Sequence, residues 1–314
     1  MWKLVAFIYD SIREGLGSPA SLYRLLETRP DLRTALTVPP QVIAAESVVK
    51  WHEWGTAPNT HGEHCNRGEL MGWRHSPGSY SSCCVRRDEF ANFGSCEITE
   101  EWECDIQDIT GLSSSKSELT DFASLDAMIE ANSREMIDAI TEEKLRENLA
   151  HDEIRILHRD DPSDFFVRHL WDGRVFLINN GGSHHFAAAR YIASRLGIPV
   201  PLCGKLHTYS INQIAVARLE RDFDMFVISD TGEGGLGFHG AMESFRATYL
   251  WQFLPRPYGD QRAILLPKLE RRSAKVAAVL REAGYFDLGA YLRGLVMRQI
   301  QNESHASASA MLLR

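Results

Sequence analysis

The polar stretch NGGSHH, residues 180–185, carries the side chains best suited to chemistry and stands between two hydrophobic runs. The run before it predicts a strand, and the alanine-rich run after it predicts a helix over 186–197 that ends at Gly197. The first amide groups of a helix have no partner within the helix, and the helix dipole adds partial positive charge there. Gly181 and Gly182 remove side-chain bulk, so the stretch predicts a binding site for an anion such as phosphate.

Other side chains near this helix start add hydrogen-bonding and titratable groups. Ser183 would bind the phosphate or cap the helix. His184 and His185 would supply donors, positive charge or a proton-transfer group. Lys205, which follows the run PVPLCG, would reach an anion at the end of the sheet. A plain strand-to-helix turn, with half-buried histidines and a solvated lysine, explains the same residues and stays open as the alternative.

Phosphoryl transfer also needs carboxylates that hold Mg²⁺ or activate a nucleophile. Asp230 and Glu233 are the favoured pair, because they follow the predicted strand MFVIS within the glycine-rich loop SDTGEGGLGFHG, residues 229–240. The loop lacks the lysine of a P-loop, and a flexible surface loop is the alternative interpretation. The other carboxylates considered are Glu153, Asp160, Asp161 and Asp172.

A second group of candidates lies in the segment 55–117, where Gly, Ser, Cys, His and Trp dominate. The motif HGEHC, residues 61–65, has a spacing suited to a structural zinc ion. The proposed ligands are His61, His64, Cys65 and, farther along, Cys83 or its neighbour Cys84. The segment has no C-x₂-C pair, so buried thiols without metal remain the alternative, and HGEHC is not the H-E-x-x-H motif of zinc proteases.

The composition is that of a soluble globular protein of one large or two ordinary domains, with 314 residues, 44% hydrophobic and 24% charged. The net charge of −8 argues against a generally basic surface for nucleic acid. No apolar run approaches the length of about 18 residues that a membrane span needs. The run Leu4–Tyr9 is too short for a signal peptide. We therefore expect a cytoplasmic protein, in which disulfides are not the default.

Hydrophobic periodicity and turn signals predict an α+β fold in five segments. These are a helical segment (1–54), a loop-rich Cys/His insertion (55–117), a helical connector (118–150), an α/β core (151–240) and a C-terminal helical segment (241–314). The strands predicted in the core are EIRIL (153–157), RVFLIN (174–179), IPVPLCGKL (198–206) and MFVIS (225–229). Ser210 and Gln213 are spaced for a capping box at the start of a helix over 210–223.

The stretch DPSDFFVRHLWDGRVFLINNGGSHHFAAARYIASRLGIPVPLCGKL, residues 161–206, resembles the core of the ParB/sulfiredoxin-like superfamily. There a strand runs into a Gly-x-His/Arg-Arg turn, which an alanine-rich helix and a strand rich in IPV follow. The chain also resembles an uncharacterised family of bacterial and phage proteins that carries GSHHFAAARYIA. The resemblance implies a small mixed sheet flanked by helices, and a nucleotide whose phosphates lie at the turn.

Carried over to this chain, the motif glycine is Gly182 and its third position is His184. His185 stands where arginine is usual, and a neutral imidazole binds phosphate less strongly than a guanidinium. Ser183 stands where the reductases of the superfamily carry cysteine, which excludes their thiol chemistry.

Three functions fit these residues. The first is an enzyme, a phosphotransferase, NTPase or nuclease that uses ATP or another nucleoside triphosphate with Mg²⁺. The second is a non-catalytic nucleotide sensor of phage or mobile-element origin, with a protein partner or a second copy of itself. The third is a nucleic-acid binder, which the net charge disfavours. A carboxylate beside His184 and His185 would favour the enzyme. Binding of a nucleotide without turnover would favour the sensor. Salt-sensitive retention on DNA or RNA would favour the nucleic-acid binder.

Overall fold

The computed structural model describes residues 10–55, 67–158, 163–230 and 234–312, with side chains as far as residue 304. The chain divides into two compact units, each assembled from separate stretches of sequence. Unit 1 comprises Met1–Thr37, Lys50–Gly94 and Ile211–Val296. Unit 2 comprises Val38–Val49, Ser95–Ser210 and Met297–Arg314.

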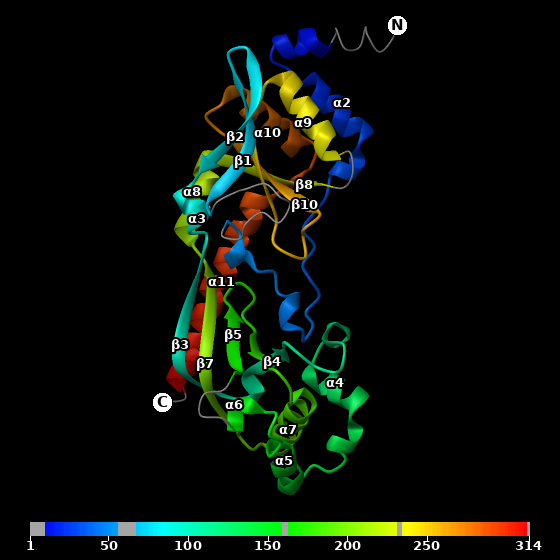
Figure 1. Ribbon diagram of the computed structural model, residues 1–314, viewed down its shortest axis with the longest axis vertical. Coiled ribbons are helices and arrows are strands. Elements are labelled where there is room, and N and C mark those ends of the chain that lie inside the picture. The colour runs from blue at the N-terminus through cyan, green and yellow to red at the C-terminus, as the bar shows by residue number, and fades with distance from the viewer. Residues whose placement is uncertain (1–9, 56–66, 159–162, 231–233, 313–314) are drawn as a thin grey trace. The chain divides into compact units, whose positions relative to one another are not determined.

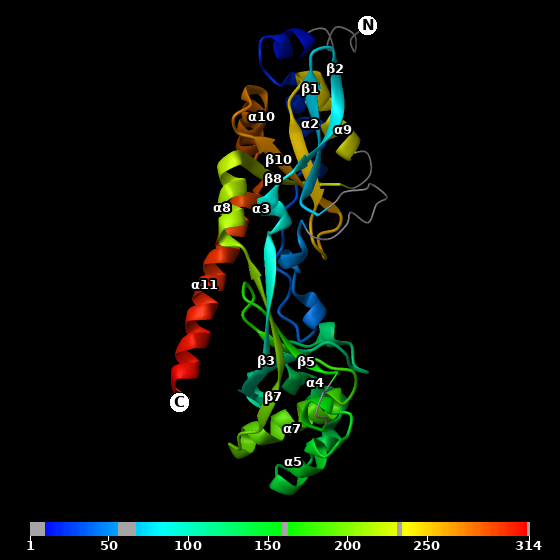
Figure 2. The same ribbon diagram turned by 60° about the vertical axis from the view of Figure 1, so that its left-hand side comes forward.

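Unit 2 is built on a five-stranded sheet (Figure 1). Its strands, in spatial order, are β3 (Gly94–Asp105), β7 (Pro201–Ile211), β5 (Phe165–His169), β6 (Val175–Ile178) and β4 (Ile109–Leu112). The sheet is mixed, because β4 pairs with β6 and β5 with β7 in parallel while β5 and β6 are antiparallel. The two long strands β3 and β7 run side by side (Figure 2).

Helix α7 (Ser183–Leu196) supplies the centre of the unit 2 core. Its buried face carries Phe186, the alanines 187–189 and Ile192, all at most 1% exposed. Three alanines in succession allow the helix to pack closely, and Gly197, at φ 67°, ends it. The helices α4 (Leu125–Asn132) and α5 (Glu142–Leu149) pack against α7.

Unit 1 is built on a six-stranded antiparallel sheet. Its strands, in spatial order, are β11 (Phe286–Asp287), β8 (Phe223–Ser229), β10 (Gln261–Pro267), β9 (Tyr249–Phe253), β1 (Glu69–Ser76) and β2 (Ser79–Arg86). One core joins β1, β2, β8, β9 and β10 to the helices α2 (Ala20–Thr28), α9 (Gly234–Phe245) and α10 (Arg271–Glu282). Further α-helices are α3 (Asp88–Ala91), α6 (Arg155–His158), α8 (Gln213–Asp222) and α11 (Leu288–Leu312), and residues 10–15 are also helical.

The prediction of an α+β fold is confirmed, but several local predictions are wrong. The segment 55–117 is not loop-rich in its described part, since it forms β1 to β4, whose strands carry many polar residues on exposed faces. The segment 241–314 contains the long helices α10 and α11, as predicted, but also the strands β9, β10 and β11, which the sequence analysis did not predict. The stretch 153–157 was predicted as a strand; the chain turns there into the short helix α6.

Two helix starts also differ from the sequence prediction. Asn212, not Ser210, caps α8, and its side chain accepts hydrogen bonds from the amides of Ile214 and Ala215. Ser210 instead bonds to Ser95 on β3. Within the described ranges, no helix has the length and apolar character that crossing a membrane requires.

Candidate functional site

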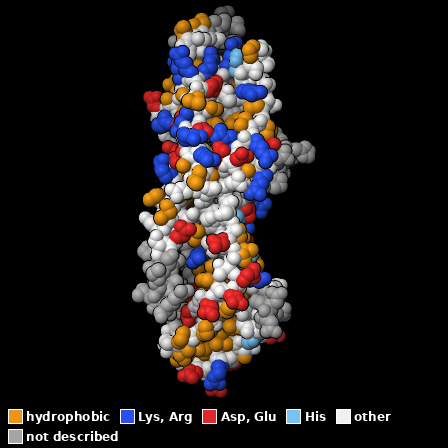
Figure 3. Space-filling view, turned by 90° about the vertical axis from the view of Figure 1, so that its left-hand side faces the viewer, with side chains coloured by type: hydrophobic (Ala, Val, Ile, Leu, Met, Phe, Trp, Pro, Cys, Tyr) orange, Lys and Arg blue, Asp and Glu red, His pale blue; other side chains and the backbone are white. Residues whose placement is uncertain are grey.

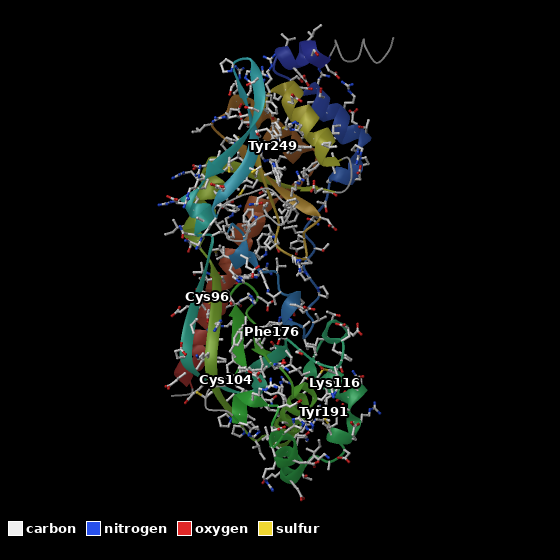
Figure 4. The ribbon with its side chains drawn as sticks, in the orientation of Figure 1. Cys96, Cys104, Lys116, Phe176, Tyr191 and Tyr249 are labelled. Carbon is white, nitrogen blue, oxygen red and sulfur yellow. The ribbon has the colours of Figure 1, made fainter. Side chains whose placement is uncertain are left out.

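Two neighbouring strands of unit 2 place polar loops at the same edge of the sheet. Because β4 and β6 are parallel, their carboxyl ends meet there, which is where α/β proteins commonly bind ligands. After β4 comes the run SSSKS, residues 113–117, here called the serine loop. After β6 come Asn179, the two glycines and the start of α7. Figure 4 shows Lys116 of the serine loop beyond β4, close to α4.

Asn179 fastens the two loops together from a buried position. Its side-chain oxygen accepts hydrogen bonds from the backbone amides of Ser113 and Ser114, both at 3.2 Å. Its side-chain nitrogen donates to the carbonyls of Ser114 and Gly181, both at 2.9 Å. The serine loop and the start of α7 are therefore held in one fixed arrangement.

The two glycines adopt backbone conformations that other residues rarely adopt, with φ 129° at Gly181 and φ 67° at Gly182. The space that the missing side chains leave is occupied by the chain's own segment at Glu153. A Cβ atom on Gly182 would lie 2.8 Å from the carbonyl carbon of Glu153. The amide of Gly182 donates to Oε2 of Glu153 at 3.3 Å. One anion, the carboxylate of Glu153, thus already lies at the beginning of α7.

His184 is held at both ring nitrogens by hydroxyl groups. Nε2 lies 3.0 Å from Oγ of Ser117, and Nδ1 lies 2.6 Å from Oγ of Ser133. Burial lowers the pKa of His184, the charge of Lys116 lowers it further, and Glu135 opposes the shift. Since the unperturbed pKa is about 6.5, the ring is neutral at pH 7.

His185 points to a different set of partners. Its Nδ1 lies 3.1 Å from Oδ1 of Asn148 on α5, and its ring stacks on His151 with centroids 3.8 Å apart. The amide nitrogen of Asn148 donates to two backbone carbonyls, so its Oδ1 is the acceptor and Nδ1 of His185 carries the proton. Burial lowers the pKa of His185, and the neighbouring His151 and His184 lower it further.

Ser183 connects α7 to the serine loop and does not cap the helix. The N-cap is Gly182, and no side chain caps this end of α7. Oγ of Ser183, a buried residue, donates to Oγ of Ser115 at 3.0 Å. Ser115 also accepts a bond from the amide of Ser117. The capping alternative for Ser183 is therefore wrong, and the serine instead shapes the loop.

Two of the other proposed site residues lie away from this cluster. Lys205 is in the middle of β7, two strands away from β6, and its Nζ pairs with Glu100 of β3 at 3.3 Å. Asp230 belongs to unit 1 and pairs with Arg262 at 2.8 Å. Glu233 lies outside the described residues.

The proposed zinc ligands are mostly outside the described part of the chain. His61, His64 and Cys65 fall in the segment 56–66, which the structure does not describe. Cys83 lies on β2, and burial raises the pKa of its thiol. Among the described residues, no three His, Cys, Asp or Glu side chains are grouped as metal binding would require.

Sequence reasoning missed the serine loop and the two residues that complete it, Asn132 and Ser133 at the end of α4. By its composition alone, the run SSSKS is typical of a linker. A signal was present, because a short apolar run, ITGL, precedes it just as VFLI precedes the glycine turn. Two strands that each end in a polar run suggest a shared sheet edge. The parallel pairing that brings them together is not visible in the sequence.

The cluster offers hydrogen-bond donors of a kind that suits an anion, but it lies in a unit whose net charge is negative. The Lys116 ammonium and the amides of Ser183, His184 and His185, which have no partner within the helix, are donors suited to an anion. Unit 2 as a whole is acidic, with 13 basic and 23 acidic residues and a net charge of −10. On the unit 2 part of the face drawn in Figure 3, the charged side chains are mostly acidic.

The comparisons with known proteins give one match. The model of one protein family, described as "Family of unknown function (DUF6685)", matches residues 99–305, which is more than half of the chain and includes the serine loop and all of α7. No curated protein and no solved structure matches the chain.

Proposed function

Since this chain belongs to the DUF6685 family, whose function is unknown, we propose a function from its own residues: unit 2 binds a phosphate-bearing ligand at the start of α7. The favoured ligand is a nucleotide such as ATP, bound with Mg²⁺. The resemblance of residues 161–206 to the ParB/sulfiredoxin-like superfamily supports the same class of ligand.

The observation that carries this proposal is the meeting of the serine loop and the start of α7 at one sheet edge. The ends of two parallel strands give a ligand access to backbone amides, and a helix start favours negative charge. Lys116 adds a cation whose side chain is exposed. A phosphate group is the common ligand that uses amide and ammonium donors together.

Glu153 determines how such a ligand would bind. Its carboxylate lies at the amide of Gly182 and would repel a phosphate placed beside it. Mg²⁺ is commonly held by one or two carboxylates together with the phosphates of a substrate, so Glu153 would hold the magnesium ion of such a ligand, whose charge would offset the repulsion. Glu153 also interacts electrostatically with His185. A carboxylate so close to the histidines supports an enzyme over a sensor.

Nucleic acid is a poorer candidate for the same surface. Affinity for nucleic acid comes largely from basic residues that neutralise backbone phosphates. Unit 2 has a net charge of −10, which opposes a long polyanion more than a single nucleotide with its metal ion.

Thermal unfolding of the full chain with ATP, ADP or inorganic phosphate, each with and without Mg²⁺, tests the proposal. At a ligand concentration 100 times the Kd, binding adds about 2.7 kcal/mol to the free energy of unfolding. We expect MgATP to raise the Tm of the wild type, and Lys116→Ala to reduce that rise. Lys205→Ala is the matched control, because Lys205 pairs with Glu100 elsewhere in unit 2 and its loss leaves the rise unchanged. If none of these ligands stabilises the folded wild type, the proposal is wrong.

A further inference from the structure

The environment of His184 is that of a general base rather than of a simple phosphate ligand. Ser117, His184 and Ser133 form a chain of two hydrogen bonds through the imidazole, at 3.0 Å and 2.6 Å. Ser117 and His184 are half-buried, and Ser133 is 4% exposed. A nucleophile, a base and a group that orients the base are the three components of the triads that activate serine.

The hydrogen bonds assign the proton positions in this chain. Ser133 Oγ donates to the carbonyl of Asn132 at 2.7 Å, because a carbonyl cannot donate. Its hydrogen is then used, so Ser133 accepts from Nδ1–H of His184. The other nitrogen, Nε2, is left unprotonated and accepts from the hydroxyl of Ser117. Asn132 Nδ2 donates to Ser117 Oγ at 2.7 Å, which fixes the hydroxyl in this orientation.

We propose that Ser117 is a catalytic nucleophile activated by His184, and that it accepts the phosphoryl group of a phosphoester bound at the start of α7. Ser133 and Asn132 are positioning residues. Ser133 holds the imidazole of His184 and Asn132 holds the hydroxyl of Ser117, so that the two groups remain hydrogen-bonded. The substrate class rests on the proposed function above, whereas the activation of Ser117 rests only on the hydrogen bonds.

The reaction takes place in two balanced steps. In the first, Ser117 Oγ forms a bond to phosphorus, the bond from phosphorus to the leaving oxygen breaks, and the serine proton passes through His184 Nε2 to that oxygen. In the second, water forms a bond to phosphorus, the bond to Ser117 Oγ breaks, and a water proton passes through His184 back to the serine. The sum is hydrolysis of a phosphoester to an alcohol and phosphate, with no redox change.

The surrounding charges suit this reaction. His184 must be neutral to take a proton, and both its half-buried position and Lys116 favour the neutral form. Lys116, next to Ser117 in the chain, also favours an anionic substrate. The charged or titratable groups that influence the ring are Lys116, Glu135 and His185. Ser133, which accepts the hydrogen bond from His184 Nδ1, is neutral, so His184 is a weaker base than a histidine paired with a carboxylate.

Covalent labelling of the full chain with a fluorophosphonate tests whether Ser117 is activated. Attack by serine forms an oxygen–phosphorus bond, expels fluoride and gives its proton to the base, and peptide mass spectrometry locates the label. We expect wild-type protein to be labelled at Ser117, and His184→Gln to slow labelling by about 10²- to 10⁴-fold, the usual contribution of a general base. Ser95 is the internal control, because its hydroxyl bonds to that of Ser210 at 2.7 Å with no histidine.

The phosphoester class is tested by incubation with p-nitrophenyl phosphate and mass spectrometry of the Ser117 peptide. A phosphoserine at position 117 that His184→Gln loses supports the proposal. Wild-type protein without a label at Ser117, or with equal labelling of Ser95, overturns it, and stabilisation by MgATP in the same protein would leave the proposed function standing. A label at Ser117 in a protein that no phosphate ligand stabilises overturns the proposed function and, with it, the phosphoester class.

Discussion

At the scale of single residues, the site depends on which nitrogen of His184 carries the proton. Ser133 decides this because its own hydrogen is used on the carbonyl of Asn132. Sequence reasoning singled out His184 as a candidate for charge stabilisation or proton transfer, but named no partner residue for it. The partner residues come from positions 117 and 133, far from 184 in the chain, and no local pattern connects them.

Replacing Ser133 by aspartate changes the basicity of His184 in a defined direction. A carboxylate at Nδ1 stabilises the protonated imidazole and raises its pKa. Because labelling of Ser117 needs the neutral ring, the rising limb of labelling rate against pH moves to higher pH in Ser133→Asp. Ser133→Thr keeps the hydroxyl and serves as the control, with its profile unchanged. An unshifted limb in a folded Ser133→Asp protein contradicts the role given to His184.

Gly182 and Gly197 have the same φ of 67°, so alanine substitutions at the two positions cause the same backbone strain. A difference in stability between the two variants then measures the crowding around Gly182. Gly197→Ala meets no atom within 4 Å and costs about 1 kcal/mol for the left-handed backbone alone. Gly182→Ala meets the backbone of Glu153 and Ile154 as well and costs about 2–4 kcal/mol. Urea unfolding of both variants measures the difference. Equal losses would mean that the segment at Glu153 does not pack against the turn.

At the scale of elements, α7 was predictable and β1 to β4 were not. The alanine-rich run with a glycine after it identifies a helix from local sequence alone, and the structure differs only in starting it at Ser183. The strands between residues 69 and 112 carry serine, glutamate and cysteine on exposed faces, so their apolar pattern is weak. The sheet is held by pairing to strands far along the chain, as in β1 with β9.

Asn179 joins the serine loop to the start of α7 through its side-chain amide. Its contribution to stability therefore depends on the hydrogen bonds of the amide more than on the size of the side chain. Asn179→Asp keeps the acceptor for the amides of Ser113 and Ser114 but sets a carboxylate oxygen against the carbonyls of Ser114 and Gly181. We expect a loss of about 3 kcal/mol, because a buried charge then faces unpaired acceptors. Asn180→Asp, at the exposed neighbouring position, is the control and is nearly neutral. Urea unfolding at pH 7 measures the stability of both variants. A similar loss at positions 179 and 180 would contradict the role given to the Asn179 side chain in joining the two loops.

At the scale of the whole molecule, the sequence predicted the α+β fold class but not the division into two units. Each unit gathers stretches from distant parts of the chain, so no linker marks a boundary. Residues that sequence reasoning placed in one core can therefore belong to different units, as the predicted acidic pair of Asp230 and Glu233 illustrates. Asp230 belongs to unit 1, whereas the carboxylate at the glycine turn is that of Glu153.

The stability of the whole chain should fall in acid because of a histidine in unit 1. Burial, together with the charge of Lys50, lowers the pKa of His52 from 6.5 to about 4. Between those values the unfolded chain binds a proton that the folded chain does not, so stability present above about pH 6.5 is lost as pH falls towards 4. His52→Gln should flatten this loss and His75→Gln, at an exposed position, should not. Chemical unfolding at several pH values measures it, and parallel curves for wild type and His52→Gln would refute it.

The measurement that tests the central claim most directly is nitrogen NMR of the histidine rings during titration of the full chain with MgATP. The free protein should show His184 as the Nδ1–H tautomer. Saturable addition of MgATP should move the His184 resonances and leave those of His75, on β1 of unit 1, in place. If the His184 resonances do not move while the protein remains folded, the start of α7 is not a phosphate-binding site.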